Sequence, residues 1–350
     1  MLYITTRDEN NVYTACRTLN EERGANGGYF VPFQLPKLDR EAIQRLKENS
    51  FGQNVADILD LLFSARLDAW DVDFCIGRYP TKLVAMSHRI VFAETWHNPD
   101  MDFARIVRNL TSRIRGIEDT ADPVNQPANW AWIAVRIAVL FGVFGDLARV
   151  NMADVDHPVD VAVPTGDFSL PMAAWYAREM GLPICNIICG CNENGVVWDF
   201  LHHGELHTAA RVVETATPEG DMVVPPHLER LIYGTLGSQE TTRFLDACAK
   251  AEDYRLSQIL LENMRQGVYA GVVSDPRMEQ IIRSMYNTST YIMDPYSALA
   301  YCSLQDYRTR YAEYRTTLVL SERSPIRFSQ TVCKALGITR DDLRDRLNLS

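Results

Sequence analysis

Four polar residues within one short segment are the first candidates for chemistry: His97, Asp100, Asp102 and Arg105. A histidine beside carboxylates can transfer a proton near neutral pH or supply half of a metal site. The same side chains can equally line a solvated loop that has no chemical role. The sequence leaves these two interpretations open.

A second polar group, residues 165–169, lies in a turn between two well-marked elements. The β-branched run at 159–164 predicts a strand, the amphipathic segment at 170–180 predicts a helix that ends at Gly181, and 184–189 predicts a second strand. Such a unit implies parallel strands joined by a right-handed crossover. The turn can bind a polar ligand at the helix N-terminus, or Asp167 and Ser169 can simply cap that helix.

Cysteines and histidines elsewhere give no strong metal pattern. Cys185, Cys189 and Cys191 lie close together, but Cys-x-Cys on an apolar run is typical of a buried strand. His203 and His207 are four residues apart, but Gly204 interrupts any helix that would bring them to one face. We therefore predict no metal site.

Bulk properties exclude several classes of protein. The chain has 350 residues, 47% of them hydrophobic, and a net charge of −10 with acidic and basic residues mixed. This pattern does not fit nucleic-acid binding. The apolar run at 133–143 is interrupted by Arg136 and is too short for a membrane span. The N-terminus does not resemble a signal peptide. The eight scattered cysteines are typical of reduced thiols. We expect a soluble cytoplasmic protein without a membrane segment.

The remaining pattern predicts a small leading α/β domain at 1–88 and an α/β core domain at 89–350. The leading part has strands at 2–5 and 29–32, a glycine-rich turn at 24–28, and helices at 39–49 and 55–67. In the core we predict further helices at 131–150, 254–267, 276–286 and 295–314, and a strand at 316–320.

Several segments in a common order resemble the threonine synthase family, which are fold-type II pyridoxal-phosphate (PLP) enzymes. These segments are GANGGYFVP at 24–32, VPTGDF at 163–168, MGLPI at 180–184, NEN at 192–194, DPYSA at 294–298 and SPIRF at 324–328. The resemblance implies a parallel-sheet large domain of this fold type with a small N-terminal α/β domain. Only residues 106–128 separate the His97 segment from the NWA stretch at 129–131, and no SGDTG-like loop occurs. The resemblance therefore implies that most of the mobile small domain is missing.

The cofactor positions that the resemblance implies have all changed. The family's HGPTLAFKD motif carries the Schiff-base lysine, and the matching segment here places Ala104 at that position. Arg105, its neighbour, stays protonated and cannot replace a lysine. In the turn of this chain that resembles the family's phosphate-binding turn, Asp167 stands in place of asparagine and Ser169 in place of glycine. The resemblance also implies that Glu322 replaces the threonine beside the pyridine nitrogen.

We therefore predict a protein that works without PLP or another cofactor, as a binding or partner protein or as a repurposed enzyme of amino-acid or natural-product metabolism. The alternative is a PLP-dependent lyase with an atypical cofactor site. The expected ligand is an amino-acid-like small molecule, and a homodimer or a protein partner is also expected. The candidate catalytic residues are His97, Asp100, Asp102, Arg105 and Glu322. The candidate substrate-binding residues are Thr165, Gly166, Asp167, Phe168, Ser169, Asn192, Asn194 and Arg323.

Overall fold

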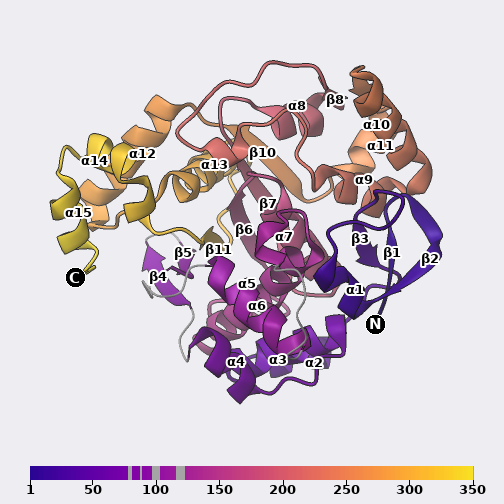
Figure 1. Cartoon of the computed structure of the whole chain (residues 1–350). Coiled ribbons are helices and arrows are strands. Elements are labelled where there is room, and N and C mark those ends of the chain that lie inside the picture. The colour runs from indigo at the N-terminus through magenta and orange to yellow at the C-terminus, as the bar shows by residue number, and fades with distance from the viewer. Residues whose placement is uncertain (78–80, 87–88, 97–102, 116–122, 350) are drawn as a thin grey trace.

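The computed structural model describes residues 1–77, 81–86, 89–96, 103–115 and 123–349. It has a six-stranded sheet at its centre, in the order β10-β7-β6-β11-β5-β4 (Figure 1). Five strands are parallel to their neighbours, and β4 at the edge pairs antiparallel with β5. The strands are β4 (Lys82–Met86), β5 (Ile90–Glu94), β6 (Val159–Pro164), β7 (Ile184–Cys191), β10 (Val268–Val272) and β11 (Thr317–Ser321).

Helices cover both faces of this sheet because its strands are apolar on both sides. In β5, Val91 and Ala93 belong to one hydrophobic core, whereas Ile90 and Phe92 belong to the other. Alternate residues of a strand point to opposite faces, so this pattern requires a layer on each side. The first core includes α6 (Trp130–Arg149), α7 (Ser169–Glu179) and α8 (Val196–His203), and the second includes α12 (Asp275–Ser289) and α13 (Pro295–Tyr311).

The N-terminal segment forms its own three-stranded antiparallel sheet, in the order β2-β1-β3, at one side of the molecule (Figure 1). Its elements are β1 (Leu2–Thr5), β2 (Asp8–Thr14), α1 (Ala15–Asn20), β3 (Phe30–Pro32), α2 (Arg40–Arg45), α3 (Phe51–Phe63) and α4 (Ala69–Ile76). Tyr3 and Trp130 pack edge to face, so this sheet and α6 share one core. The family resemblance implied such a leading α/β unit.

The remaining elements surround this framework. They are α5 (Phe103–Arg115), η2 (Pro123–Asn125), β8 (Glu205–Leu206), η3 (Pro218–Gly220), α9 (Leu228–Leu236), α10 (Ser238–Lys250), β9 (Tyr254–Arg255), α11 (Gln258–Met264), η4 (Pro325–Phe328), α14 (Ser329–Leu336) and α15 (Arg340–Arg346). Between β5 and α6, the described residues form only α5 and the short η2. The C-terminal helices α14 and α15 lie opposite the N-terminal sheet (Figure 1).

Helix α6 is long and apolar enough to cross a membrane by length and composition alone. However, 89% of its most apolar window is buried inside the protein. The helix begins at the Asn129 cap, whose side chain accepts a hydrogen bond from the backbone N–H of Ala131. The prediction of a buried helix is therefore confirmed.

The predicted β–α–β unit is present, with β6 parallel to β7 and α7 between them. The predicted helix at 254–267 is wrong in its first third. Tyr254 pairs with Leu206 in the small β8–β9 sheet, and the helix begins only after Ser257, whose side chain accepts from the N–H of Leu260. A polar cap thus starts the helix later than hydrophobic periodicity predicted.

Candidate functional site

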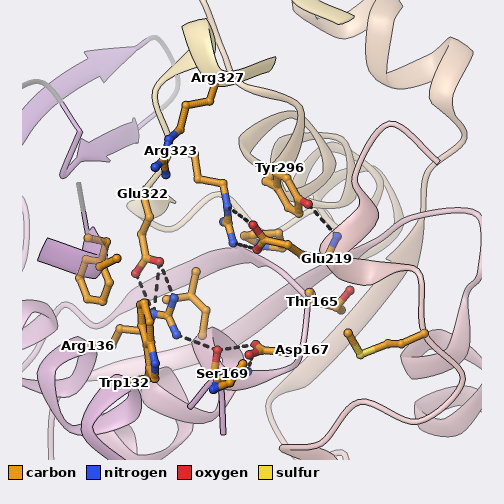
Figure 2. A pocket seen from close by; sticks show the side chains of 17 residues that line it. Trp132, Arg136, Thr165, Asp167, Ser169, Glu219, Tyr296, Glu322, Arg323 and Arg327 are labelled. Atoms are coloured by element: carbon orange, nitrogen blue, oxygen red, sulfur yellow. Dashed lines mark hydrogen bonds and ion pairs between the residues drawn. The ribbon is translucent and has the colours of Figure 1, made fainter. Parts of the chain in front are cut away.

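A cavity of about 430 Å³ lies at the carboxyl ends of β6 and β11, which are neighbours in the sheet. Open parallel sheets place their ligand sites at this edge because the loops that leave adjacent strands converge there. The turn after β6 contributes Thr165, Gly166, Asp167 and Ser169, and the segment after β11 contributes Glu322 and Arg323 (Figure 2). The two groups are far apart in the sequence, and the sheet brings them together.

The turn after β6 has an unusual backbone. Gly166 and Phe168 both have positive φ angles, 45° and 70°, and Phe168 is a non-glycine residue in the left-handed region. This conformation points Asp167 back over the first turn of α7. One oxygen, Oδ1, accepts hydrogen bonds from the Ser169 backbone N–H at 2.9 Å and from the Ser169 hydroxyl. The carboxylate of Asp167 therefore occupies the backbone donor that an anionic ligand would need.

Arg136 and Glu322 form a buried ion pair in one wall of the cavity. Their side chains are 8% and 7% exposed, and the Arg136 Nε and Nη2 atoms donate to both Glu322 oxygens at 2.8–3.2 Å. The remaining Arg136 nitrogen, Nη1, donates to Ser169 Oγ at 2.7 Å. The rings of Phe103 and Trp132 pack against this guanidinium at 5.0 and 5.3 Å. Glu322, a predicted catalytic residue, is thus engaged through both oxygens.

A second ion pair borders the cavity on the side of α13. Arg323 donates to Glu219, which comes from η3, and its guanidinium lies 4.1 Å from the ring centre of Tyr296. The Tyr296 hydroxyl in turn accepts from the Glu219 backbone N–H at 3.0 Å. Burial would lower the pKa of Arg323, but Glu219 and Glu322 outweigh it and raise that pKa. Arg323 is therefore a permanent cation. Figure 2 shows its pairing with Glu219.

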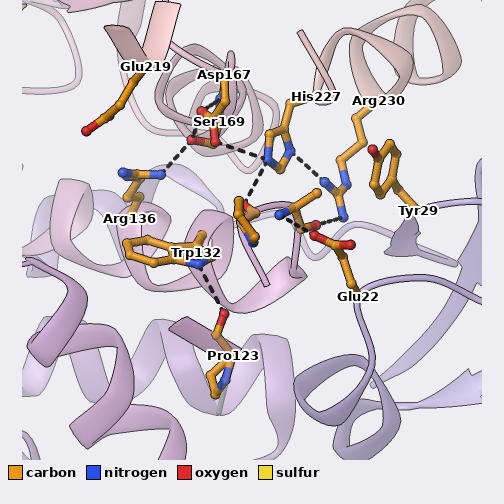
Figure 3. Close-up of polar contacts among 12 residues, drawn as sticks. Glu22, Tyr29, Pro123, Trp132, Arg136, Asp167, Ser169, Glu219, His227 and Arg230 are labelled. Atoms are coloured by element: carbon orange, nitrogen blue, oxygen red, sulfur yellow. Dashed lines mark hydrogen bonds and ion pairs between the residues drawn. The ribbon is translucent and has the colours of Figure 1, made fainter. Parts of the chain in front are cut away.

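His227 lies directly behind Asp167 (Figure 3). It is fully buried, and its Nε2 atom is 3.8 Å from Asp167 Oδ2. Arg230 donates to His227 Nδ1 at 2.6 Å, which leaves the ring proton on Nε2. Burial, followed by the charge of Arg230, lowers the pKa of His227 to about 3. The imidazole is therefore neutral at physiological pH.

The charge state of Asp167 follows from these neighbours. Burial would raise the pKa of Asp167, but His227, Arg136 and the hydrogen bonds from Ser169 together lower it below its ordinary value. An anionic carboxylate therefore stands in the turn where the family resemblance implies a phosphate site. A phosphate there would meet a like charge.

No lysine reaches the cavity. All five lysines of the chain lie among the described residues, and none lines the cavity, whereas Ala104, where the family resemblance implies a lysine, does. Lys82 is exposed on β4, with Nζ 3.6 Å from Glu94. Without an amine, and with Asp167 in the anion position, the described residues do not fit PLP.

Most predicted residues of the turn and of the 322–323 segment line one cavity, but others do not. Phe168 is buried in the hydrophobic core, and Arg105 is exposed on α5 and is not part of the cavity wall. His97, Asp100 and Asp102 lie outside the described residues.

Asn192 and Asn194 lie outside the cavity wall but hold a loop that supplies part of it. The Asn192 amide donates to Asp221 at 2.8 Å, and the Asn194 amide donates to Asp221 at 3.0 Å and to the carbonyl of Val213 at 2.9 Å. These bonds fix loop 213–221, which carries Glu219 to the cavity. Asn192 and Asn194, which were predicted to bind substrate, therefore contact this loop and do not line the cavity.

The histidine and cysteine pairs show no metal-binding arrangement. Helix α8 ends at His203 because Gly204 adopts a left-handed conformation, so His207 is not on the same helix. Cys189 and Cys191 are buried in β7, and burial raises the pKa of both thiols. Within the described parts of the chain, no three His, Cys, Asp or Glu residues are grouped to hold a metal ion.

Sequence reasoning missed several cavity residues: Arg136, Glu219, Tyr296 and Arg327, and also His227 behind the wall. A signal for Arg136 existed, because an arginine within an apolar helix must find a buried partner. Tyr296 and Arg327 belong to segments that carried the family resemblance. Glu219 and His227 lie in an irregular stretch with no pattern.

Sequence comparisons place the chain near one family. A family model described as the threonine synthase N terminus matches residues 2–78. Human threonine synthase-like 1 is 31% identical over 175 residues, which cover 49% of this chain and 24% of that protein. Threonine synthase from Saccharomyces cerevisiae is 23% identical over 225 residues, or 60% of this chain and 43% of that protein. The chain thus matches from about a quarter to less than half of these relatives' length.

Solved structures agree with the sequence comparisons in fold. PLP-bound threonine synthase from Brucella melitensis superposes with a TM-score of 0.84 and 19% identity, covering 99% of this chain and 94% of that chain. Yeast threonine synthase gives a TM-score of 0.83 at 17% identity, covering 100% and 94%. The predicted family resemblance and the predicted mainly parallel α/β fold are both confirmed.

Proposed function

Because this chain is a relative of the threonine synthases, we propose that it is a divergent member that has lost PLP chemistry. It binds an amino-acid-like small molecule in the former cofactor cleft, either as a binding protein or as a repurposed enzyme of amino-acid or natural-product metabolism. The fold alone does not decide between these roles, because function depends on the residues of the site.

The observation that carries the proposal is the composition of the cavity wall. Ala104 stands where a Schiff-base lysine would be required, and the nearest cations are arginines, which cannot form that bond. Arg136 and Glu322 satisfy each other, so Glu322 is held as a structural partner of a cation. The changes concern three separate cofactor contacts, which supports a changed role over a single inactivating substitution.

The cavity nevertheless keeps the properties of a small-molecule site. Its volume of about 430 Å³ lies in the range of ordinary ligand pockets, and its wall combines aromatic rings with a few charged groups. Its ion pairs are fixed by buried or aromatic neighbours, so the polar groups are preorganised for a ligand. We infer that binding has been retained while the chemistry of the family has not.

The alternative, a PLP-dependent lyase, is favoured by one observation: a solved relative of the same fold is PLP-bound. That likeness points toward PLP as a cofactor of the family. For this chain the alternative would require an amine from outside the described cavity wall, and a phosphate position that tolerates Asp167. We therefore place it second.

The test is incubation of purified protein with PLP, followed by borohydride reduction and peptide mapping. The PLP-bound Brucella melitensis enzyme serves as the positive control. We expect no modified lysine in this protein, and we expect mass spectrometry of the purified protein to find a small molecule other than PLP. A reduced lysyl adduct at stoichiometric yield would contradict the proposal.

Two further expectations from the sequence stay predictions: a cytoplasmic location, and a homodimer or protein partner. Sedimentation analysis of the purified protein would decide the second.

A further inference from the structure

The turn after β6 holds an anion of its own, the Asp167 carboxylate. Its Oδ1 atom takes the Ser169 backbone N–H and the Ser169 hydroxyl, which are the donors that an anionic ligand would use. Within the part of the chain that the structure describes, Oδ2 accepts no hydrogen bond, and the side chain is 30% exposed toward the cavity. Capping of helix α7 explains the hydrogen bonds of Asp167 Oδ1, but it does not involve Asp167 Oδ2.

Among the described residues, the Asp167 carboxylate has no arginine or lysine in direct contact with it. Arg136, the nearest cation, already forms the two-pronged ion pair with Glu322. His227 on the other side is neutral, because Arg230 donates to its Nδ1 and excludes a second proton there. Arg230 balances the charge of this group, but it contacts the imidazole and not the carboxylate, so among the described residues no cation lies directly against Asp167 Oδ2.

The opposite side of the cavity has a different character. Arg323 and Arg327 lie there, and Figure 2 shows Arg327 across the cavity from Asp167 and Ser169. Arginine is a donor only, and Arg323 already donates to Glu219, so both donors and a carboxylate line this side. The β6 turn thus offers a ligand a carboxylate oxygen that no described donor occupies, whereas Arg323 on the opposite side is already paired.

We propose that Asp167 is the subsite for a primary ammonium group, so that the cavity selects an aminated small molecule over an anion such as a phosphate ester. This inference rests on the proposed function, because it assumes a ligand in place of PLP. Oδ2 accepts the ammonium hydrogen bond, while Ser169 holds Oδ1 and fixes the orientation of the carboxylate. Arg323 and Arg327 line the side of the cavity that faces the far end of the ligand.

Asp167→Asn is the decisive variant, because it removes the charge but keeps the local structure. The asparagine Oδ1 can still accept from the Ser169 backbone N–H, so the turn and helix α7 should fold as before. Asp341→Asn, at an exposed position in the first turn of α15, is the matched control. Calorimetric titrations would use four probes: pentylamine, 5-aminopentanoate, pentanoate and inorganic phosphate.

We expect the two aminated probes to bind the wild type and the control, with 5-aminopentanoate the tighter of the two. Asp167→Asn should weaken both by at least roughly tenfold, which is the size of one charge-assisted hydrogen bond. The same variant should bind phosphate more tightly than the wild type does. Even if the variant fails to fold, titration of the wild type with the four probes shows whether the subsite prefers a cation or an anion.

Three outcomes would overturn the inference while leaving the proposed function intact. They are tighter binding of pentanoate or phosphate than of the amines by the wild type, an unchanged amine affinity in Asp167→Asn, and no binding of either amine at millimolar concentration. A lysyl adduct after PLP treatment would instead remove the proposed function and this inference together. The two failures are thus distinguishable.

Discussion

Removing the charge of Glu322 should destabilise the protein strongly, because it leaves Arg136 as an unpaired buried cation. Both side chains are less than a tenth exposed, and three nitrogen–oxygen contacts of 2.8–3.2 Å join them. Glu322→Gln keeps the shape and one acceptor of the side chain but removes its charge. The remaining partners of Arg136 are the Ser169 hydroxyl and the nearby Asp167.

The expected magnitude follows from buried ion pairs in general. Breaking such a pair by removing one partner costs about 3–5 kcal/mol, and we expect the lower end, about 3 kcal/mol, because Asp167 remains close by. A chain of this size has an unfolding entropy of roughly 0.7 kcal/mol per kelvin, so the melting temperature should fall by about 4 °C. Glu21→Gln, which breaks an exposed i,i+4 pair with Arg17, should change stability by less than about 1 kcal/mol.

Differential scanning calorimetry of Glu322→Gln, Glu21→Gln and the double variant Arg136→Met/Glu322→Leu would measure these terms. The double variant removes both charges and replaces them with apolar groups, so it should be more stable than Glu322→Gln. If Glu322→Gln melts within about 1 °C of the control variant, the ion pair does not hold the cavity wall. If the double variant is instead the least stable of the three, an unpaired charge on Arg136 is not what destabilises Glu322→Gln.

Three further results are expected. Between about pH 7.5 and 5.5 the wild type should lose about 1.4 kcal/mol more stability than His227→Gln in denaturant titrations, because the unfolded histidine gains a proton near pH 6.5 while the buried one, with a pKa of about 3, does not. An unchanged slope in His227→Gln would mean that His227 is not held neutral. Asn192→Ala should speed proteolytic cleavage of loop 213–221 and lower stability by about 1–3 kcal/mol, because it removes one donor to Asp221 and a donor to the carbonyl of the buried Thr217. An unchanged cleavage rate would show that Asn192 does not hold the loop. Ala104→Lys alone should give no borohydride-stable PLP adduct, whereas Ala104→Lys/Asp167→Asn should give one, and an adduct in the single variant would show that Asp167 does not exclude the phosphate.

The fold could be predicted where local pattern and tertiary environment agree. The strand at Val159–Pro164 was predicted with its observed bounds, because a β-branched run buried on both faces leaves no competing pattern. The helix predicted at 254–267 failed at its start, because Tyr254 pairs with Leu206 in a distant segment. Periodicity within one segment carries no information about such a pairing.

The residues of the site also differ in whether a local sequence pattern predicts them. The turn at 165–169 and the segment at 322–323 were predictable, because motif and strand end coincide there. Glu219 and His227 were not, because they reach the site through a long irregular stretch held by Asn192 and Asn194. Its path depends on side-chain bonds between distant residues, and no local pattern encodes them.

The altered contacts are also linked to one another, which bears on how the site can change. Glu322 stands where the family resemblance implies threonine, and its charge is balanced by Arg136, which also holds Ser169, the donor to Asp167. Restoring threonine at 322 alone would leave Arg136 without its carboxylate partner in the core, and restoring a glycine at 169 alone would remove the acceptor of Arg136 Nη1 and a donor to Asp167. Each of these two steps toward a PLP site therefore costs stability before any cofactor contact is regained. The network consequently keeps the cavity in its present charged form, and a change of ligand should come from residues outside the network, such as Met222 or Arg327.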